Sequence, residues 1–351
     1  MANITMMHWN LETYGPGKYA NANNAQFINY IAKLIHNVDA EIVAIVEVKN
    51  SVSANVALGI ANATFALDNV IGPNPWHGVV INSGKNNEAY IILYRNDRQF
   101  LPVAIGGGGA LVTGLAVTPQ FGMSNDDAAG NSINFPSAMT KTGGRLPFFA
   151  TFQTTDNNRN FSVISYHAMF GNATANGIIR LPRLNYITQF ANPPANTAMY
   201  ASLISGDFNV DFDSANPGYY TNMINLPTYQ ATNQLTSMKN APVVSDDPSD
   251  YLLNAYDNIF QTVLAATPTG NVIDLMVESA IVVGPQPAPP AAQPHVGNLS
   301  AEAGAFNPVH IPNNVALNPV AAVPPSDMPE AWAFVREAIT NHYPVVTTAT
   351  I

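Results

Sequence analysis

The chain contains no cysteine among its 351 residues. Disulfide bonds, thiolate nucleophiles and cysteine-ligated zinc are therefore excluded as sources of stability or chemistry. Charge is also scarce, because only 10% of the residues are charged, with 13 Lys and Arg against 23 Asp and Glu. Proteins that hold nucleic acid tightly need clustered cations, so this balance argues against such a protein but not against an enzyme that contacts nucleic acid briefly.

Long apolar runs are also lacking. No stretch of eighteen consecutive apolar residues occurs, so the sequence predicts no membrane-spanning segment. The first strand-like run begins within two residues of Met1, without the basic and apolar regions of a signal peptide. We expect a soluble protein with no signal peptide in this chain, and its compartment stays open, since a secreted mature form also fits the lack of cysteine.

Apolar periodicity predicts strands and helices that alternate along the whole chain. The predicted strands are 4–9, 41–48, 76–81, 89–94, 148–152, 161–166, 201–205, 259–263, 272–283 and 343–348, and the predicted helices are 23–36, 53–67, 176–190 and 328–339. This alternation indicates an α/β protein. We predict a single domain over residues 1–351, which is long enough to bury a substantial core.

A proline-rich segment interrupts this pattern. Residues 285–325 contain ten prolines and little periodicity, and only one helix and one strand are predicted after them. That remainder is too short for a second core, so we interpret the segment as an insertion within one domain, either surface decoration or a lid over the substrate. The glycine run 106–109 lacks the lysine and hydroxyl residue of a phosphate-binding loop and is interpreted as a hairpin tip.

Acidic, amide and imidazole side chains fall at the ends of predicted strands. The three clearest segments are Ser205-Gly206-Asp207-Phe208-Asn209, Tyr256-Asp257-Asn258-Ile259 and Asn341-His342-Tyr343-Pro344-Val345. Open α/β sheets bind their ligands at strand ends. Carboxylates suit a hard cation and an imidazole can move a proton, so the pattern favours metal-assisted cleavage of a phosphate ester.

Eight short motifs occur in an order that is typical of one superfamily. They are Trp9-Asn10-Leu11-Glu12, Val46-Glu47-Val48-Lys49-Asn50-Ser51, Glu88-Ala89-Tyr90, Arg145-Leu146-Pro147, Tyr166-His167, Gly206-Asp207-Phe208-Asn209, Tyr256-Asp257-Asn258-Ile259 and Asn341-His342-Tyr343-Pro344-Val345. Together they resemble the endonuclease/exonuclease/phosphatase superfamily, and most of all pancreatic deoxyribonuclease and its bacterial relatives. The resemblance implies a four-layer sandwich of two packed mixed β-sheets flanked by helices, and it covers the chain apart from the proline-rich insertion and residues 111–144.

The resemblance also implies a metal site. Glu47 matches the principal metal carboxylate, with Asn10 beside it and Glu12 as a further ligand. Oxygen ligands of this kind suit Mg²⁺ or Mn²⁺. The superfamily commonly has Asp immediately before its final histidine, where this chain has Asn341, so we expect a neutral ligand and weaker metal binding there.

The implied catalytic residues surround an imidazole. His342 matches the catalytic histidine, and Asp257 the carboxylate that accepts from its other nitrogen and raises its basicity. Asp207 matches the carboxylate that orients or deprotonates water. Asn209 matches the amide that steadies a phosphoryl oxygen.

Four further residues match features of the deoxyribonuclease branch. His167 and Glu88 resemble its second histidine–carboxylate pair. Arg145 matches a phosphate-contacting arginine, and Lys49 stands where the family often has an arginine that enters the minor groove of DNA. These matches imply a DNA endonuclease of low sequence specificity, with DNA as a transient substrate and no protein partner.

Two other functions stay open. A lipid or inositol phosphate could be the substrate of the same site, which the low basic charge favours. A catalytically weakened binding protein is the second alternative, with Asn341 as its first sign. The remaining histidines have no motif around them and are interpreted as structural or solvent-facing: His8, His36, His77, His295 and His310.

Overall fold

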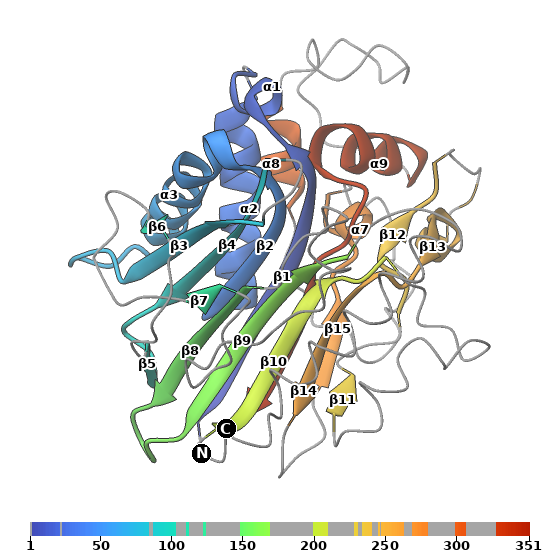
Figure 1. Ribbon diagram of the computed structural model, residues 1–351. Coiled ribbons are helices and arrows are strands. Elements are labelled where there is room, and N and C mark those ends of the chain that lie inside the picture. Colours follow the sequence, from blue (N-terminus) through green and yellow to red (C-terminus); the bar gives the residue numbers. More distant parts are fainter. Residues whose placement is uncertain are drawn as a thin grey trace.

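Two mixed β-sheets pack face to face in the computed structural model (Figure 1). The structure describes residues 2–21, 23–83, 87–102, 110–111, 122–123, 148–168, 199–209, 228–230, 234–240, 245, 247–262, 269–279, 299–306 and 328–351. The two sheets with their flanking helices confirm the predicted α/β sandwich.

The first sheet holds seven strands in the order β15-β16-β1-β2-β4-β3-β6. β1 pairs in parallel with β2 and antiparallel with β16, so the N-terminal strand lies at the centre beside the C-terminal strand. The strands are β1 (Asn3–Tyr14), β2 (Ile42–Lys49), β3 (Trp76–Asn82), β4 (Glu88–Arg95), β6 (Ala110–Leu111), β15 (Thr269–Val272) and β16 (Val345–Thr350).

The second sheet has the order β11-β14-β10-β9-β8-β5, with β7 also paired to β8. β9 and β10 are parallel, whereas β14 runs antiparallel to β10. The strands are β5 (Phe100–Pro102), β7 (Gly122–Met123), β8 (Phe148–Thr154), β9 (Asn160–His167), β10 (Met199–Asp207), β11 (Thr228–Gln230) and β14 (Asp257–Thr262). A separate small pair joins β12 (Ser237–Met238) to β13 (Leu252–Asn254).

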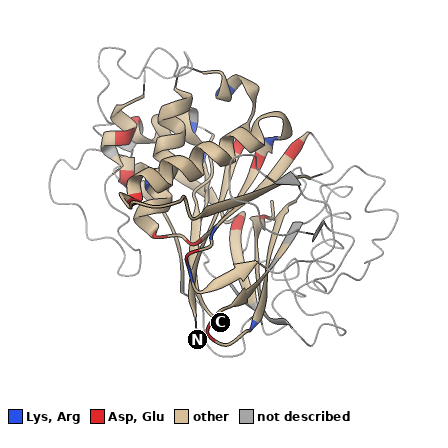
Figure 2. Ribbon diagram, turned by 90° about the vertical axis from the view of Figure 1, so that its left-hand side faces the viewer, with Lys and Arg blue, Asp and Glu red and all other residues tan. Residues whose placement is uncertain are grey.

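Helices of the described ranges cover the outer face of the first sheet (Figures 1 and 2). The longest are α2 (Asn24–Val38) and α3 (Asn50–Asp68), which end at Asp39 and Asn69 in the left-handed conformation that these residue types tolerate. The shorter ones are α1 (Pro16–Tyr19), α7 (Leu275–Ser279), α8 (Ser300–Gly304), α9 (Met328–Phe334) and the π-helical turn η4 (Val335–Ile339). The 3₁₀ turn η2 (Pro248–Tyr251) lies instead beside β13 of the small strand pair. Within these ranges no helix has the length and apolar character needed to cross a membrane.

Aromatic side chains join the inner faces of the two sheets. Tyr94 of β4 packs edge-on against Phe152 of β8, with ring centroids 5.3 Å apart. Phe152 also contacts Phe100 and Phe161 of its own sheet. All four residues are buried. The packing of their rings therefore fixes the distance between the two sheets.

One predicted element is wrong. Residues 272–283 were expected to form a strand, but β15 ends at Val272 and α7 begins three residues later. Asp274 lies between them, and its Oδ1 accepts a hydrogen bond from the backbone N–H of Met276 at 3.0 Å. A side-chain oxygen in this position satisfies a free N–H of the first helical turn, so the apolar run continues as a helix. The predicted helix at 176–190 and the glycine run 106–109 lie outside the described residues.

Part of the proline-rich segment belongs to the core. Residues 299–306 of that segment contain α8, which packs against α2 and α7. Leu299, Ala303 and Phe306 are buried there, and the Phe306 ring contacts Phe334 with centroids 5.1 Å apart. The composition of the segment did not predict this helix, because its few apolar residues give no clear period.

A glycine in β10 is required by the approach of a neighbouring strand. A Cβ atom added to Gly206 would lie 1.9 Å from the carbonyl oxygen of Tyr166 in β9. We therefore expect Gly206→Ala to lower the free energy of unfolding by about 3 kcal/mol, at the upper end of overpacking effects. Thermal or urea denaturation measures this change.

The matched control is Gly59→Ala in α3. There the added Cβ makes only ordinary contact with Ile28, at 3.5 Å, and alanine is favoured over glycine within a helix by about 0.5–1 kcal/mol. Equal stability of the two variants would contradict the close approach of β9 to β10.

Candidate active site

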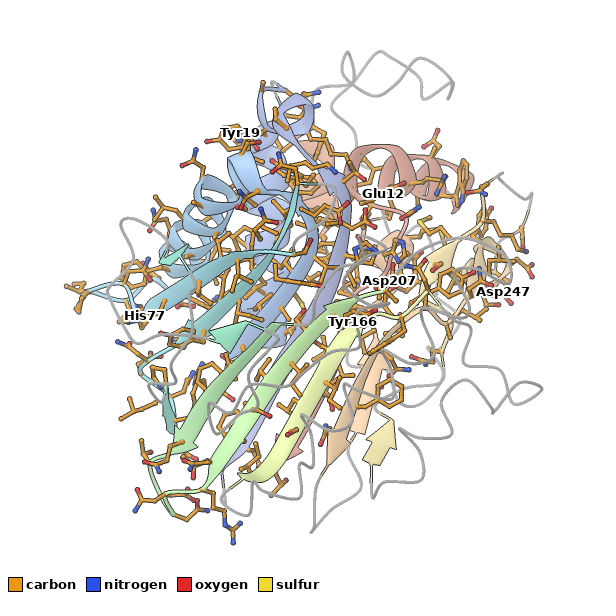
Figure 3. The ribbon with its side chains drawn as sticks, in the orientation of Figure 1. Glu12, Tyr19, His77, Tyr166, Asp207 and Asp247 are labelled. Atoms are coloured by element: carbon orange, nitrogen blue, oxygen red, sulfur yellow. The ribbon has the colours of Figure 1, made fainter. Side chains whose placement is uncertain are left out.

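The second sheet by itself brings three of the predicted residues together. Asp207 ends β10, and its strand neighbours are His167 at the end of β9 and Asp257 at the start of β14. All three side chains are buried. Figure 3 shows Asp207 at this edge of the sandwich, with Glu12 of the first sheet above it.

Asn10 links this row to the first sheet. Its Nδ2 donates to Asp207 Oδ2 at 2.9 Å and to Glu47 Oε1 at 3.3 Å. Two anionic oxygens on one side of the amide fix its orientation, because an amide oxygen in the same place would be repelled. The opposite atom, Asn10 Oδ1, accepts from the backbone N–H of Glu12 at 2.8 Å.

The ends of β1 and β2 are irregular where they carry acidic side chains. The pairing register shifts between Asn10 and Tyr14 on β1 and between Ile45 and Val48 on β2. Glu47 lies inside the β2 irregularity with φ 62°, in the left-handed region that costs a non-glycine residue about 1–3 kcal/mol. Bulges of this kind re-aim a side chain and are common beside active sites.

A threonine secures the Glu47 carboxylate. Thr13, also in the left-handed region with φ 54°, donates to Glu47 Oε2 from its backbone N–H at 2.9 Å and from Oγ1 at 3.2 Å. Glu47 Oε1 lies 3.1 Å from His167 Nε2. Both carboxylate oxygens are therefore oriented by neighbouring donors.

His342 forms a short contact with Asp257. His342 Nδ1 lies 2.6 Å from Asp257 Oδ2, and His342 Nε2 lies 3.8 Å from Asp207 Oδ2. Burial lowers the pKa of His342, but the charge and hydrogen bond of Asp257 outweigh it and raise this pKa to about 10. Burial raises the pKa of Asp257, yet its partner His342 brings it down to about 2. The pair is therefore ionised at neutral pH, with His342 as an imidazolium.

The backbone around His342 is held by the first sheet. Thr340 Oγ1 donates to the Asn10 carbonyl oxygen at 2.8 Å and accepts from the His342 backbone N–H at 3.1 Å. Trp9 Nε1 donates to the His342 carbonyl oxygen at 3.0 Å. Residues of β1 and Thr340 therefore set the position of the His342 imidazole, although His342 itself lies just before β16.

His167 occupies the other half of the site. Its Nδ1 lies 3.5 Å from Glu88 Oε2, and its backbone N–H donates to the Tyr90 hydroxyl at 3.1 Å. Burial lowers the pKa of His167, but the neighbouring carboxylates of Glu47 and Glu88 raise it overall. His167 is thus a second imidazole that lies between two carboxylates, one of which is Glu88, its partner in the resemblance.

Lys49 and Asn209 are placed beside these groups. The Lys49 ammonium lies 3.4 Å from Glu88 Oε1, so this side chain, predicted to contact DNA, is engaged within the site. Asn209, with φ 49°, donates from its backbone N–H to Asp207 Oδ1 at 2.8 Å and from Nδ2 to the Ala168 carbonyl oxygen at 3.0 Å. Its predicted contact with a phosphoryl oxygen stays a prediction.

Glu12 and Asn341 form the rim nearest to α9. The Asn341 backbone N–H donates to Glu12 Oε2 at 3.1 Å, and burial raises the pKa of Glu12. Asn341 Oδ1 is a buried oxygen without a hydrogen-bond partner in the described part of the chain. A buried carbonyl oxygen of this kind is suited to accept a cation or a donor group of a ligand.

The donor set fits a divalent cation. Among the described residues, two groups with ligand atoms within 4.8 Å of one another could hold a metal ion: Glu47, His167 and Asp207, and Asp207, Asp257 and His342. Burial and the neighbouring Asp257 raise the pKa of Asp207, since several carboxylates are crowded there. A bound cation would relieve this repulsion.

The structure also adds residues that the sequence did not single out. His8, left without a motif, is fully buried, and its Nε2 lies 3.3 Å from Asp257 Oδ1. Thr13 and Thr340 hold Glu47 and the His342 loop, as described above. Only His8 carried a usable signal, because it precedes Asn10 by two residues and therefore lies on the same face of its strand. The predicted Arg145 lies outside the described residues.

No family model matches the sequence, and no curated protein matches it either. Solved structures do match over the whole chain. An endonuclease/exonuclease/phosphatase family protein from Bacteroides thetaiotaomicron aligns with a TM-score of 0.56 and 12% identity, covering 99% of this chain and 98% of that one.

Two further similar structures carry functional names. A mannosyl-6-phosphatase from B. thetaiotaomicron aligns with a TM-score of 0.55 and 12% identity over 99% of this chain and 100% of its own. TDP2 of D. rerio, crystallised with single-strand DNA product, aligns with a TM-score of 0.50 and 9% identity over 100% of both chains. The chain thus has the fold of endonuclease/exonuclease/phosphatase proteins, as the motifs indicated, while the closer resemblance to pancreatic deoxyribonuclease stays a prediction.

Proposed function

We propose that this protein is a divalent-metal-dependent hydrolase of phosphate esters. The proposal rests on the buried His342–Asp257 pair. Nε2 of His342 faces the Asp207 carboxylate, and Oδ2 of Asp207 lies 3.8 Å from it. An imidazolium and a carboxylate side by side supply an acid and a base across one substrate position.

The proposed reaction assigns each group a step. Asp207, with its raised pKa, takes a proton from an attacking water as the new P–O bond forms. His342, as an imidazolium, donates to a phosphoryl oxygen where negative charge develops. The bond to the leaving oxygen breaks, and His167 supplies the proton that this oxygen gains.

We assign the metal site to Glu47, with Glu12 and Asn341 as further ligands and with Asn10 as a ligand through its Oδ1, since its Nδ2 donates to Glu47 and Asp207. A bound Mg²⁺ or Mn²⁺ would supply the positive charge that offsets both these carboxylates and the phosphoryl oxygens. Oxygen donors dominate this set, which favours these two ions over softer ones.

DNA is the first proposed substrate, cut internally with little sequence preference. The motifs that resemble the deoxyribonuclease branch support it, and so does the His167–Glu88 arrangement. The structurally similar TDP2 carries single-strand DNA product, which adds support for nucleic acid as a substrate class.

A small phosphorylated sugar, inositol or lipid headgroup is the second candidate. The Lys49 ammonium faces Glu88 rather than solvent, with the side chain only 23% exposed. Lys and Arg of the described residues lie singly rather than in a stripe (Figure 2), whereas duplex binding draws on clustered cations. A phosphatase named for a mannosyl phosphate shares the fold.

One set of assays separates these candidates. Supercoiled plasmid, mannose 6-phosphate, inositol phosphates and sphingomyelin are each incubated with Mg²⁺, with Mn²⁺ and with EDTA. Metal-dependent nicking supports the nuclease, and phosphate or phosphocholine release without nicking supports the second candidate. Failure on every substrate while metal still binds would leave a non-catalytic binding protein.

The substitution Asn341→Asp is expected to tighten Mg²⁺ binding. The change adds a negative charge beside Glu12, where Asn341 offers a neutral oxygen that no described residue contacts by a hydrogen bond. The same charge repels Glu12 in the absence of metal, so the melting temperature in EDTA should fall below that of the wild type and rise more steeply with Mg²⁺. Metal titration by calorimetry gives the affinity, and an unchanged or weaker constant would contradict Asn341 as a ligand.

A further inference from the structure

Asp257 is contacted by two histidines, one in β1 and one in the connection before β16. His342 Nδ1 lies 2.6 Å from Asp257 Oδ2, and His8 Nε2 lies 3.3 Å from Asp257 Oδ1. His8 and Asp257 have side chains with 0% exposure. The function proposed above uses His342 and Asp257 but leaves His8 without a role.

The contact with His8 has a defined direction. An ionised carboxylate only accepts hydrogen bonds, so Nε2 of His8 must carry the hydrogen that points at Asp257. His8 Nδ1 is buried and has no hydrogen-bond partner among the described residues. Burying an unpaired nitrogen costs free energy, so an apolar side chain would be the more stable occupant unless the contact with Asp257 has a use.

The backbone of His8 is rigidly held. It lies in the interior of β1, paired with Ala44 of β2 on one side and Val345 of β16 on the other. His8 therefore reaches the second sheet from a fixed point, whereas His342 lies in the short connection before β16.

We propose that His8 is a positioning residue that fixes the plane of the Asp257 carboxylate and, through it, the orientation of the His342 ring. Rotation about the terminal bond of an aspartate is loosely restricted, so a carboxylate held at one oxygen can turn. The hydrogen bond at Oδ1 stops that rotation and keeps Oδ2 aimed at His342 Nδ1. The effect on catalysis rests on the proposed hydrolase function, but the geometric effect does not.

The test compares three substitutions of His8. His8→Leu fills the space without a donor, and we expect kcat to fall by about 10- to 100-fold, the usual scale for a group behind a catalytic or ligand residue, with KM little changed. His8→Gln places an amide N–H near the position of Nε2 and should regain most of the turnover. The shorter amide of His8→Asn does not reach Oδ1 of Asp257, so this variant should behave like His8→Leu. It replaces His8→Leu in the test if the leucine variant does not fold.

A purely structural role predicts the opposite order. A buried position without a polar function would favour leucine over glutamine, in turnover as in melting temperature. Equal turnover in the Leu and Gln variants, or higher turnover in the Leu variant, would overturn the proposal.

A second readout is independent of any activity. The proton in the short His342–Asp257 contact should give a far-downfield ¹H resonance in metal-free protein, assigned by its loss in His342→Asn. We expect this resonance to move or broaden in His8→Leu and to be kept in His8→Gln. An unchanged resonance in His8→Leu would overturn the positioning role, whereas an inactive wild type with the expected spectra would overturn only the proposed function.

Discussion

Replacing His342 with alanine is expected to lower kcat by several hundredfold or more. Loss of a general acid or base costs roughly 10²- to 10⁴-fold, and His342 is the imidazole whose Nε2 faces Asp207. Its pKa, raised to about 10 by the Asp257 carboxylate against the effect of burial, keeps the ring protonated at neutral pH. Steady-state kinetics on whichever substrate the assays identify measures the loss, and retained activity would refute the assigned role.

The substitution His342→Asn distinguishes chemistry from folding. An asparagine amide can take the place of Nδ1 beside Asp257 Oδ2 but has no counterpart of Nε2. We expect it to lose as much turnover as the alanine variant while keeping more stability, because Asp257 Oδ2 retains a donor in addition to the His8 contact at Oδ1. His36→Ala is the matched control. His36 is half-buried in α2, outside the candidate site, and its Nδ1 lies 3.0 Å from Asp68 Oδ1. Its turnover should equal that of the wild type.

Much of the fold follows from short-range patterns in the sequence. The apolar face of α2 and the nearly continuous apolar runs of β3 and β4 could be predicted because each pattern lies within one element. The helix α7 could not be predicted, because the apolar run from Val272 onward fits a strand as well as a helix. A single side chain decides between the two. That side chain is Asp274, whose cap on Met276 starts the helix.

The meeting of Asp207, His167 and Asp257 could be anticipated from their places at strand ends, because parallel and antiparallel pairing bring such ends to one edge. The direction in which each side chain points could not be anticipated. Glu47 reaches Asn10 and His167 only because its backbone takes φ 62° within a bulge, and no residue type in that segment signals such a conformation.

Contacts over long sequence separations were the hardest to foresee. His8 and Asp257 are 249 positions apart, and although His8 shares a strand face with Asn10, nothing in the sequence indicates its contact with Asp257. Their contact depends on how the inner faces of the two sheets are stacked, a relation set by the whole core. Lys49 shows the same limit, because its motif did not indicate that its ammonium lies 3.4 Å from Glu88, and its predicted contact with DNA stays a prediction.

Replacing Glu47 with glutamine is expected to weaken divalent-metal binding by at least about 100-fold, because groups behind the ligands already cost 10- to 100-fold when lost. Glutamine keeps the shape and can still accept from Thr13, so the irregular end of β2 should persist. In EDTA the variant should be somewhat less stable than the wild type, because the amide nitrogen that replaces one carboxylate oxygen cannot accept from Asn10 and His167, although one negative charge beside Asp207 is removed. The effect on the metal is therefore measured as the change in melting temperature that Mg²⁺ produces within each variant.

Thermal melting with and without Mg²⁺ measures this effect without reference to turnover. A ligand at 100 times its dissociation constant stabilises the folded state by about 2.7 kcal/mol, so wild-type protein should melt at a higher temperature in Mg²⁺ than in EDTA. Glu47→Gln should show almost no such rise. Glu41→Gln is the matched control, because Glu41 immediately precedes β2 at its opposite end and accepts from the Thr5 backbone N–H at 2.9 Å. The control should keep the full rise, and an equal rise in both variants would mean that Glu47 does not hold the metal.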